Sequence, residues 1–263
     1  MDFKRKNRYT IDDLLNIMQI LRSPEGCPWD REQDHQSIRN CLIEETYEAV
    51  EAIDNDDSEL LKEELGDVLL QVLFHSQLEK EQGRFDFSDV VDGIAQKMVI
   101  RHPHVFGDAV ASDSDAVLIK WDEIKKETKH QTTQTQVLQS VSKALPALMR
   151  SAKVQHKAAK VGFDWPDISG AMEKVREETE ELNEAIASEN AQHCEEELGD
   201  LLFSVVNVSR FLQVEPEQAL AKSCEKFIAR FAVMERLAQE RGMDLQTLTL
   251  QEMDQLWNEA KVM

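Results

Sequence analysis

Apolar residues recur every three or four positions along most of the chain, which is the spacing of amphipathic helices. The first such stripe begins at Ile11, directly after Thr10, which together with Asp13 has the composition of a helix-capping box. This helix should end before Pro24. No segment alternates apolar and polar residues as a half-buried strand does, so the pattern predicts an all-α protein.

Further apolar stripes predict a series of helices in both halves of the chain. Ser58 can cap a long helix that runs toward Gly83, and Ser88 can cap another that ends before Pro103. A short helix should carry Trp121. The other predicted helices cover about 36–52, 142–160, 168–187, 191–213, 216–240 and 249–261.

A polar stretch rich in threonine and glutamine interrupts the helical pattern near the middle of the chain. It begins after Glu127, and no apolar stripe returns until Val137. Such a composition is typical of linkers. We therefore expect an N-terminal module over 1–127, a polar linker over 128–140 and a C-terminal module over 141–263.

Composition narrows the possible functions. The 263 residues include only 9 Gly and 6 Pro, so turn-rich folds and Gly-rich phosphate loops are disfavoured, while 41% hydrophobic residues suffice for packed cores. The net charge is −21, from 30 basic against 51 acidic residues. This acidity argues against a nucleic-acid polymer as partner. A phosphorylated small molecule stays compatible with it, provided that a metal cation lies between the ligand and the acidic protein.

Nothing in the sequence indicates a membrane or an oxidising compartment. The four cysteines (Cys27, Cys41, Cys194 and Cys224) form no C-x-x-C pair, which favours reduced thiols. The basic first ten residues are followed by no apolar segment of a signal peptide, and no apolar run approaches the ~20 residues of a membrane span. We expect a soluble, cytoplasmic protein.

Two glutamate-rich motifs occur twice in the chain. E-E-T-Y-E at 44–48 and E-E-L-G-D at 63–67 return, each 133 residues later, as E-E-T-E-E at 177–181 and E-E-L-G-D at 196–200. Two shorter patterns, K-x-x-x-R and W-x-x-x-K, follow in both halves. They pair Lys97 and Arg101 with Lys226 and Arg230, and Trp121 and Lys125 with Trp257 and Lys261. Four motifs in the same order indicate duplication of one helical module.

The spacing of the second-half motifs brings carboxylates together. Residues three or four apart share a helix face, so Glu178 and Glu181 should project from one helix, and Glu197 and Asp200 from its antiparallel neighbour. Converging carboxylates repel unless they are protonated or bind cations. An all-oxygen ligand set suits Mg²⁺ or Mn²⁺, which can activate water and neutralise charge in phosphoryl transfer. The matching acids of the first half are Glu45, Glu48, Glu64 and Asp67.

Other interpretations of these motifs stay open. Glutamate-rich helices are often merely solvated, but the duplicated spacing and the apolar neighbours of Asp200 favour a site. A di-iron centre would need E-x-x-H pairs, which the motifs lack. The K-x-x-x-R pairs fit either surface charges or phosphate clamps. Trp121 and Trp257 fit either core positions or, with the lysine one turn later, a cover for a nucleobase.

Two further motifs have the composition of structural turns. The two histidines of R-H-P-H at 101–104 have no other His or Cys at zinc-ligand spacing, so we expect a turn after a helix rather than a zinc site. G-C-P-W-D at 26–30 should form a rigid turn, with Cys27 as a buried thiol.

The motifs GCPWD, EETYE, EELGD, RHPHVFGD, VGFDW and the second EELGD resemble the two-domain form of the MazG family of nucleoside triphosphate pyrophosphohydrolases, over nearly the whole chain. The resemblance implies an all-α fold of two tandem helical modules, whose helix-bundle cores a homodimer would complete. It also implies Mg²⁺-dependent cleavage of NTPs and dNTPs to the monophosphate and pyrophosphate. It assigns metal binding to Glu178, Glu181, Glu197 and Asp200, and nucleotide contacts to Lys174, Lys226, Arg230, Trp257 and Lys261.

One comparison between the modules bears on which of them is active. Lys174 and His193 flank the second-half acids, whereas Cys41 and Leu60 stand at the matching positions. We therefore expect the C-terminal module to be the main catalytic site and the N-terminal acids to form a weaker metal site. The rival hypothesis is a helical regulatory or scaffold protein that retains only metal or nucleotide sensing. The other candidate residues are Glu177 or Glu178 for proton removal and His193 and Glu196 for substrate contact.

Overall fold

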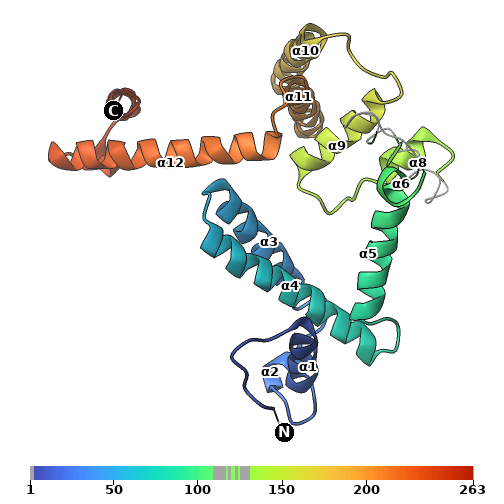
Figure 1. Cartoon of the computed structure of the whole chain (residues 1–263). Helices are drawn as coiled ribbons and strands as arrows, with labels where there is room; N and C mark the ends of the chain where they lie inside the picture. Colours follow the sequence, from blue (N-terminus) through green and yellow to red (C-terminus); the bar gives the residue numbers. More distant parts are fainter. Residues whose placement is uncertain (1–2, 109–116, 118–119, 122–123, 125–130, 263) are drawn as a thin grey trace. The chain divides into compact units, whose positions relative to one another are not determined.

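The computed structural model (Figure 1) describes residues 3–108, 117, 120–121, 124 and 131–262. These residues form helices, turns and irregular segments and no strand, so the prediction of an all-α protein is confirmed. None of the helices in this part of the chain is both long and apolar enough to cross a membrane. Contacts divide the chain into two compact units, Met1–Lys125 and Lys126–Met263.

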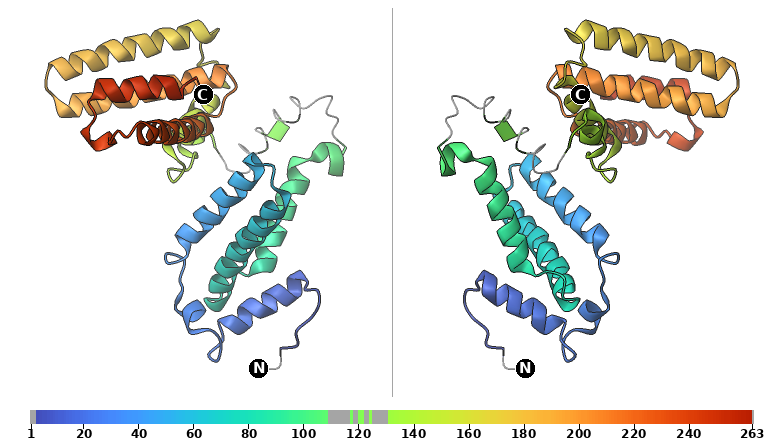
Figure 2. Two further views of the ribbon diagram at one scale, coloured as in Figure 1. Left: turned by 90° about the vertical axis from the view of Figure 1, so that its left-hand side faces the viewer. Right: turned by 90° about the vertical axis from the view of Figure 1, so that its right-hand side faces the viewer.

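The first unit is built around two long antiparallel helices. Its described helices are α1 (Ile11–Leu21), α2 (Pro28–Glu32), α3 (Arg39–Asp54), α4 (Ser58–Glu81), α5 (Phe87–Arg101) and α6 (Pro103–Phe106). The long pair is α3 and α4, which pack side by side (Figure 2), and α1 and α5 both pack against α4. A small buried core of Met18, Ile38, Phe74 and Leu78 joins α1 to α4.

The second unit repeats the long antiparallel pair and adds further helices. Its described helices are α8 (Gln134–Gln139), α9 (Ala147–Ala159), α10 (Ile168–Ala187), α11 (Ala191–Phe211), α12 (Pro216–Glu240), the short 3-10 helix η1 (Leu245–Thr247) and α13 (Leu250–Ala260). The long pair here is α10 and α11, which makes the most extensive helix contact of the chain's described part. Helix α12 packs against α13 and α9, and its core with α13 contains Met234, Leu237, Ala238 and Leu256.

The turn between the paired helices is built in the same way in both units. In the first unit, Asp56 has a left-handed backbone conformation (φ 54°), and the Asp57 side chain accepts hydrogen bonds from two backbone N–H groups at the start of α4. In the second unit, Glu189 (φ 53°) and Asn190 take these two roles at the start of α11. Each lies 133 residues after its counterpart. The duplicated turn therefore begins the second helix of each pair, α4 and α11, in the same way.

Three helix starts differ from the predicted ones. Asp57 caps α4 in place of Ser58, and Asp86 caps α5 in place of Ser88, because an aspartate just before the helix offers a carboxylate to the same unpaired N–H groups. Helix α9 begins at Ala147 rather than near residue 142, since the residue before a proline is disfavoured in helical geometry and Pro146 is the N-cap.

Other local predictions are confirmed or corrected. The Thr10 capping box is present, and Gly83 adopts the left-handed conformation (φ 67°) expected after a helix end. R-H-P-H is divided between two helices rather than forming the predicted turn: Arg101 ends α5, His102 lies between the helices, and Pro103 and His104 begin α6. The prediction of a turn with a buried thiol at G-C-P-W-D is wrong: Pro28 occupies the first position of helix α2, and its N-cap Cys27 is only half-buried.

Residues 131–140, which lie in the segment expected to be a linker, contain helix α8. Gln134 donates a hydrogen bond of 2.7 Å from Nε2 to the carbonyl oxygen of Lys157 on α9. Val137 and the following Val141 are both buried. This stretch therefore takes part in the packing of the second unit, whereas residues 128–130 lie outside the described part of the chain.

Charged and aromatic contacts hold the segment that leads into α10. Arg210 on α11 donates two hydrogen bonds to the Asp164 carboxylate, one of them 2.8 Å long from Nη1. The Trp165 ring lies against Gly170, where a Cβ atom would come within 2.7 Å of the ring. Because any larger residue would displace the ring, Gly170 and the G-F-D-W motif at 162–165 together set how α10 begins beside α11.

A hydrogen-bonded cluster ties α4 to its flanking segments in the first unit. The Glu79 carboxylate accepts two hydrogen bonds from the Arg84 guanidinium, one of them 2.6 Å long, and lies 2.6 Å from Nε2 of His35. The Arg84 hydrogen bond is the main cause that holds the pKa of Glu79 below its ordinary value of 4.5. The resulting stabilisation is complete above the ordinary pKa and is lost as the pH falls through the lowered one.

We predict that Glu79→Gln lowers the denaturant midpoint at neutral pH, and that its difference from the wild type shrinks as the pH falls below the ordinary range of glutamate titration. Denaturation followed by circular dichroism over a pH series measures this difference. Glu59→Gln is the matched control, because Glu59 on the same helix makes only an exposed ion pair with Lys62. A pH-independent effect of Glu79→Gln would contradict the role of its ionised carboxylate.

Candidate active site

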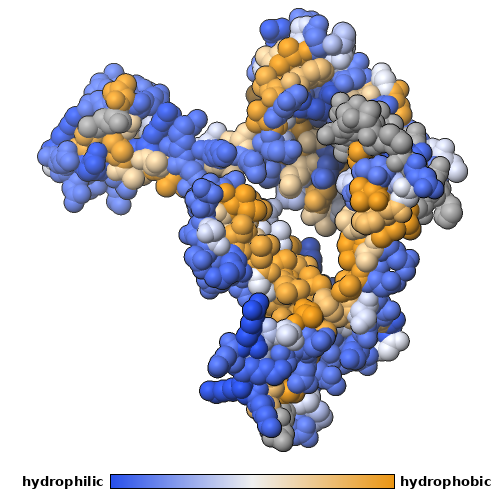
Figure 3. Space-filling model, in the orientation of Figure 1, coloured by the Kyte–Doolittle hydropathy of each residue, from blue (hydrophilic) through white to orange (hydrophobic). Residues whose placement is uncertain are grey.

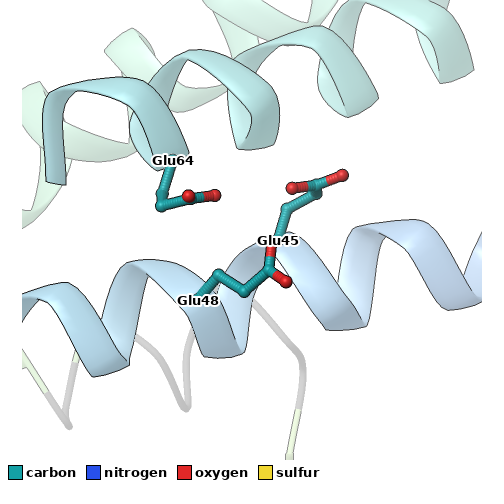
Figure 4. Close-up of side chains that lie close together, drawn as sticks. All are labelled: Glu45, Glu48 and Glu64. Atoms are coloured by element: carbon teal, nitrogen blue, oxygen red, sulfur yellow. The ribbon is translucent and has the colours of Figure 1, made fainter. Parts of the chain in front are cut away.

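Three carboxylates of the first unit converge between α3 and α4. Glu45 and Glu48 project from α3, and Glu64 projects toward them from α4 (Figure 4). One carboxylate oxygen of each lies within 4.8 Å of those of the other two. Glu64 is buried, with 8% of its surface exposed.

Burial and mutual repulsion shift the titration of this cluster. Burial raises the pKa of Glu45 most, followed by the charges of Asp67, Glu48 and Glu64. Burial likewise raises the pKa of Glu64, and Glu48 and Asp67 add to it. Asp67 therefore acts on the cluster electrostatically, although it is not one of the three residues whose oxygens converge. Negative charge held together in this way is what a divalent cation relieves.

The second unit holds an equivalent cluster between α10 and α11. Oxygens of Glu178, Glu197 and Asp200 lie within 4.8 Å of one another. Glu178 is the most buried, with 4% of its surface exposed. Glu181 lies one turn further along α10, outside the convergent set, but burial and then the charge of Glu178 raise its pKa. The structure thus brings three of the four predicted acids into one cluster and keeps the fourth beside it.

The second cluster has basic partners that the first one lacks. Nζ of Lys174 lies 2.8 Å from Oε1 of Glu177 and 2.6 Å from Oε1 of Glu178, and these hydrogen bonds raise the pKa of Lys174 above its ordinary value. Nε2 of His193 lies 3.1 Å from Oε1 of Glu197. Both basic groups were expected to contact the substrate, and the structure pairs them with the acidic side chains of the cluster and of Glu177.

Most of the other predicted substrate contacts belong to a separate part of the second unit. Lys226 and Arg230 lie on α12, whereas Glu196 is exposed on α11 directly before Glu197. The Trp257 ring packs at 4.9 Å from that of Phe227, beside the core that α12 shares with α13. Nζ of Lys261 donates to Oδ1 of Asn258 at 3.0 Å. Within the described residues, no hydrogen bond or ion pair joins Lys226, Arg230, Trp257 or Lys261 to the acidic cluster.

The first-unit counterparts of these substrate contacts are only partly described. Lys97 and Arg101 lie on α5, and Lys125 lies outside the described part of the chain. The half-buried Trp121 ring meets His102 edge-on at 4.8 Å.

On α4 and on α11, the sequence analysis missed one buried polar residue that lies a turn after the acidic motif. Gln71 lies four residues after Asp67 and is 92% buried, and its Oε1 has no hydrogen-bond partner among the described residues. The buried Ser204 lies four residues after Asp200, at the matching position. Both share a helix face with the acids before them. The signal was a single polar residue recurring at the 133-residue offset within an apolar stretch.

The acidic helix pairs lie in segments that match a known domain family. The sequence profile of the MazG nucleotide pyrophosphohydrolase domain matches residues 33–106 and 168–232. The two matched segments contain both acidic helix pairs, α3 with α4 and α10 with α11.

Curated relatives extend this similarity to nearly the full chain. It is 45% identical over 250 residues to the nucleoside triphosphate pyrophosphohydrolase/pyrophosphatase MazG of Thermotoga maritima, with 95% of both chains covered. It is 44% identical over 256 residues to the nucleoside triphosphate pyrophosphohydrolase of Escherichia coli K12, covering 95% of this chain and 97% of the relative. The uncharacterized protein YabN of Bacillus subtilis is 50% identical over 247 residues, which cover 50% of that longer protein. The chain therefore belongs to the MazG nucleotide pyrophosphohydrolase family.

Proposed function

We propose that the protein is a Mg²⁺-dependent nucleoside triphosphate pyrophosphohydrolase, which cleaves NTPs and dNTPs to the nucleoside monophosphate and pyrophosphate. The observation that carries this proposal is the duplicated carboxylate cluster between paired helices, in a chain whose full-length relatives bear that activity in their names. The acids alone would only repel one another, so their convergence favours a site that operates with a cation.

The donor set fits magnesium, with manganese as a substitute. Glu178, Glu197 and Asp200 offer only oxygen ligands, and Glu181 stands beside them. Hard divalent cations take such ligands and keep several positions for water and substrate phosphates. Bound there, the metal would supply charge neutralisation at the phosphates and lower the pKa of a water molecule.

The chain's own residues divide the remaining tasks. Glu178 is buried and engaged with the other two acids, whereas the neighbouring Glu177 is exposed and pairs only with Lys174 among the described residues. We therefore assign proton removal from the attacking water to Glu177. Lys174 is placed to turn from the acids to a phosphate, and Arg230 can bind a phosphate with two donors.

We further propose that the active form is a homodimer. The 30.2 kDa chain exposes 18950 Å² of surface. Two separate compact domains of half that mass would together expose about 14,000 Å². The surplus exceeds the ~1,600 Å² that a standard protein interface buries.

The exposed surface has the chemistry of an interface. Figure 3 shows apolar residues gathered over α4 and toward α5. Leu65 and Leu69 of α4 and Ile94 and Met98 of α5 are exposed. In the second unit Leu198, Leu202, Phe203, Phe227, Ile228 and Phe231 are exposed on α11 and α12. Apolar faces of this extent are rare on monomers. A second copy of the chain would cover them, and association is also the step that we expect to bring the basic residues of α12 to an acidic cluster.

We predict that the purified protein releases pyrophosphate from several NTPs and dNTPs with Mg²⁺ or Mn²⁺, and is inactive in EDTA. A coupled pyrophosphate assay with and without chelator measures this. Turnover that persists after metal analysis finds the protein metal-free would contradict the proposal. Nucleotide binding without turnover would instead favour a regulatory or sensing protein.

We predict that Glu197→Ala or Asp200→Ala lowers turnover on the order of a hundredfold or more, as loss of a group that stabilises developing charge does. The matched controls are Glu64→Ala and Asp67→Ala, which lie 133 residues earlier and should cost much less. Circular dichroism and gel filtration establish that each variant folds and associates normally. If the first-unit variants were the inactive ones, the assignment of the catalytic module would be reversed.

A further inference from the structure

The two carboxylate clusters differ in the lysine that pairs with the second cluster. In the second unit the Lys174 ammonium lies 2.6 Å from the buried carboxylate of Glu178 and 2.8 Å from Glu177. In the first unit the matching residue is Cys41, and no basic side chain pairs with Glu45, Glu48 or Glu64 among the described residues. Both clusters lie between antiparallel helices joined by the same kind of turn, although the first takes two acids from α3 and one from α4, and the second takes one from α10 and two from α11.

A lysine at this place competes with a metal for one carboxylate. Glu178 is a member of the convergent set and Lys174 occupies its Oε1, so a cation bound by that set would share this carboxylate with the ammonium. An ammonium and a divalent cation close together also repel each other. The His193 ring would repel a metal in this way only when it carries a proton, whereas a lysine amine is charged throughout the physiological range.

A triphosphate changes the balance, because it offers Lys174 another anionic partner. When the ammonium turns to a phosphate, the Glu178 carboxylate becomes available, and the repulsion between ammonium and metal is offset by the phosphate charge. Metal and nucleotide then strengthen each other's binding at this cluster, and the coupling is reciprocal.

We propose that Lys174 is a tethered counter-cation that keeps the second cluster from binding free divalent metal, so that this site takes its metal together with the nucleotide. The first cluster, expected from the sequence to be the weaker metal site, is then the one that binds free metal on its own. The inference rests on the proposed function of the two clusters. Two turns after Glu64 on the same face of α4, the buried Gln71 has an Oε1 without a hydrogen-bond partner among the described residues, and such an oxygen can accept from a water that Mg²⁺ retains.

Binding of Mn²⁺ to the full chain, followed by electron paramagnetic resonance of the free ion, tests the proposal without turnover. Without nucleotide we expect one tight site per chain, which Glu64→Gln removes and Glu197→Gln leaves intact. In Lys174→Met a second site should appear, with an affinity raised about tenfold or more over that of the wild-type second cluster, the order expected when one nearby charge is removed. Lys174→Arg keeps the charge and should stay like the wild type.

The repeat supplies the reciprocal variant. Cys41→Lys places an ammonium at the matching position of the first cluster and should weaken its tight site by a similar factor. A nucleoside triphosphate with a methylene group in place of the α,β-bridging oxygen should raise the wild-type stoichiometry from one to two, beyond the metal that the analogue binds in the matched Glu197→Gln sample.

Two tight sites in the nucleotide-free wild type, or an unchanged stoichiometry and affinity in Lys174→Met, would overturn the proposal. Either result could occur in a fully active enzyme, so the failure of this inference is distinct from a failure of the proposed function. Absence of Mn²⁺ binding at both clusters, together with absence of hydrolysis, would instead contradict the proposed function.

Discussion

Repulsion among carboxylates is the constraint on which the rest of this structure depends. In each unit a pair of antiparallel helices brings oxygens of three acidic side chains within 4.8 Å of one another. Burial and neighbouring charges raise the pKa of Glu45 and Glu64 in the first cluster and of Glu181 beside the second. Helix packing must hold this arrangement against the charge. The same turn, a left-handed residue followed by an Asp or Asn cap, begins the second helix of the pair in both units. Because the fold maintains this electrostatic cost in both units, the two clusters favour the interpretation as cation sites over that as solvated helix faces.

The helices and the grouping of acidic side chains on them could be predicted from the sequence because both depend on local spacing. The periodic apolar positions gave α10, α11 and α12 nearly residue by residue, and i, i+3 spacing placed Glu197 and Asp200 on one face. Prediction failed where neighbouring residues compete for one role. Asp57 and Ser58 can both cap a helix, and Pro28 can start a helix as well as a turn. Contacts between distant segments, such as Arg210 with Asp164, leave no local pattern at all.

The basic residues show more clearly which contacts could not be predicted from local spacing. Motif spacing identified Lys174 and His193 as neighbours of the acids, and their i, i+4 spacing permits the pairs that they form with Glu178 and Glu197, but the sequence alone does not distinguish such a pair from a phosphate contact. Nor could it indicate that the Trp257 ring lies beside the core that α12 and α13 share, and contacts the exposed Phe227. One scaffold thus carries two charge patterns. The first cluster is purely acidic among its described neighbours, and in the second Lys174 neutralises part of the acidic charge. In our proposal this difference separates a site for free cation from a site that takes metal together with an anionic substrate.

Diffraction from crystals soaked with Mn²⁺ and the methylene analogue of a nucleoside triphosphate, recorded at a wavelength where manganese scatters anomalously, tests the central claim most directly. The account predicts an anomalous peak within direct coordination distance of Glu178, Glu197 and Asp200, with Lys174 turned from Glu178 to a phosphate oxygen of the analogue. Analogue bound at the second cluster with no manganese beside those three acids, or with Lys174 still on Glu178, would contradict it.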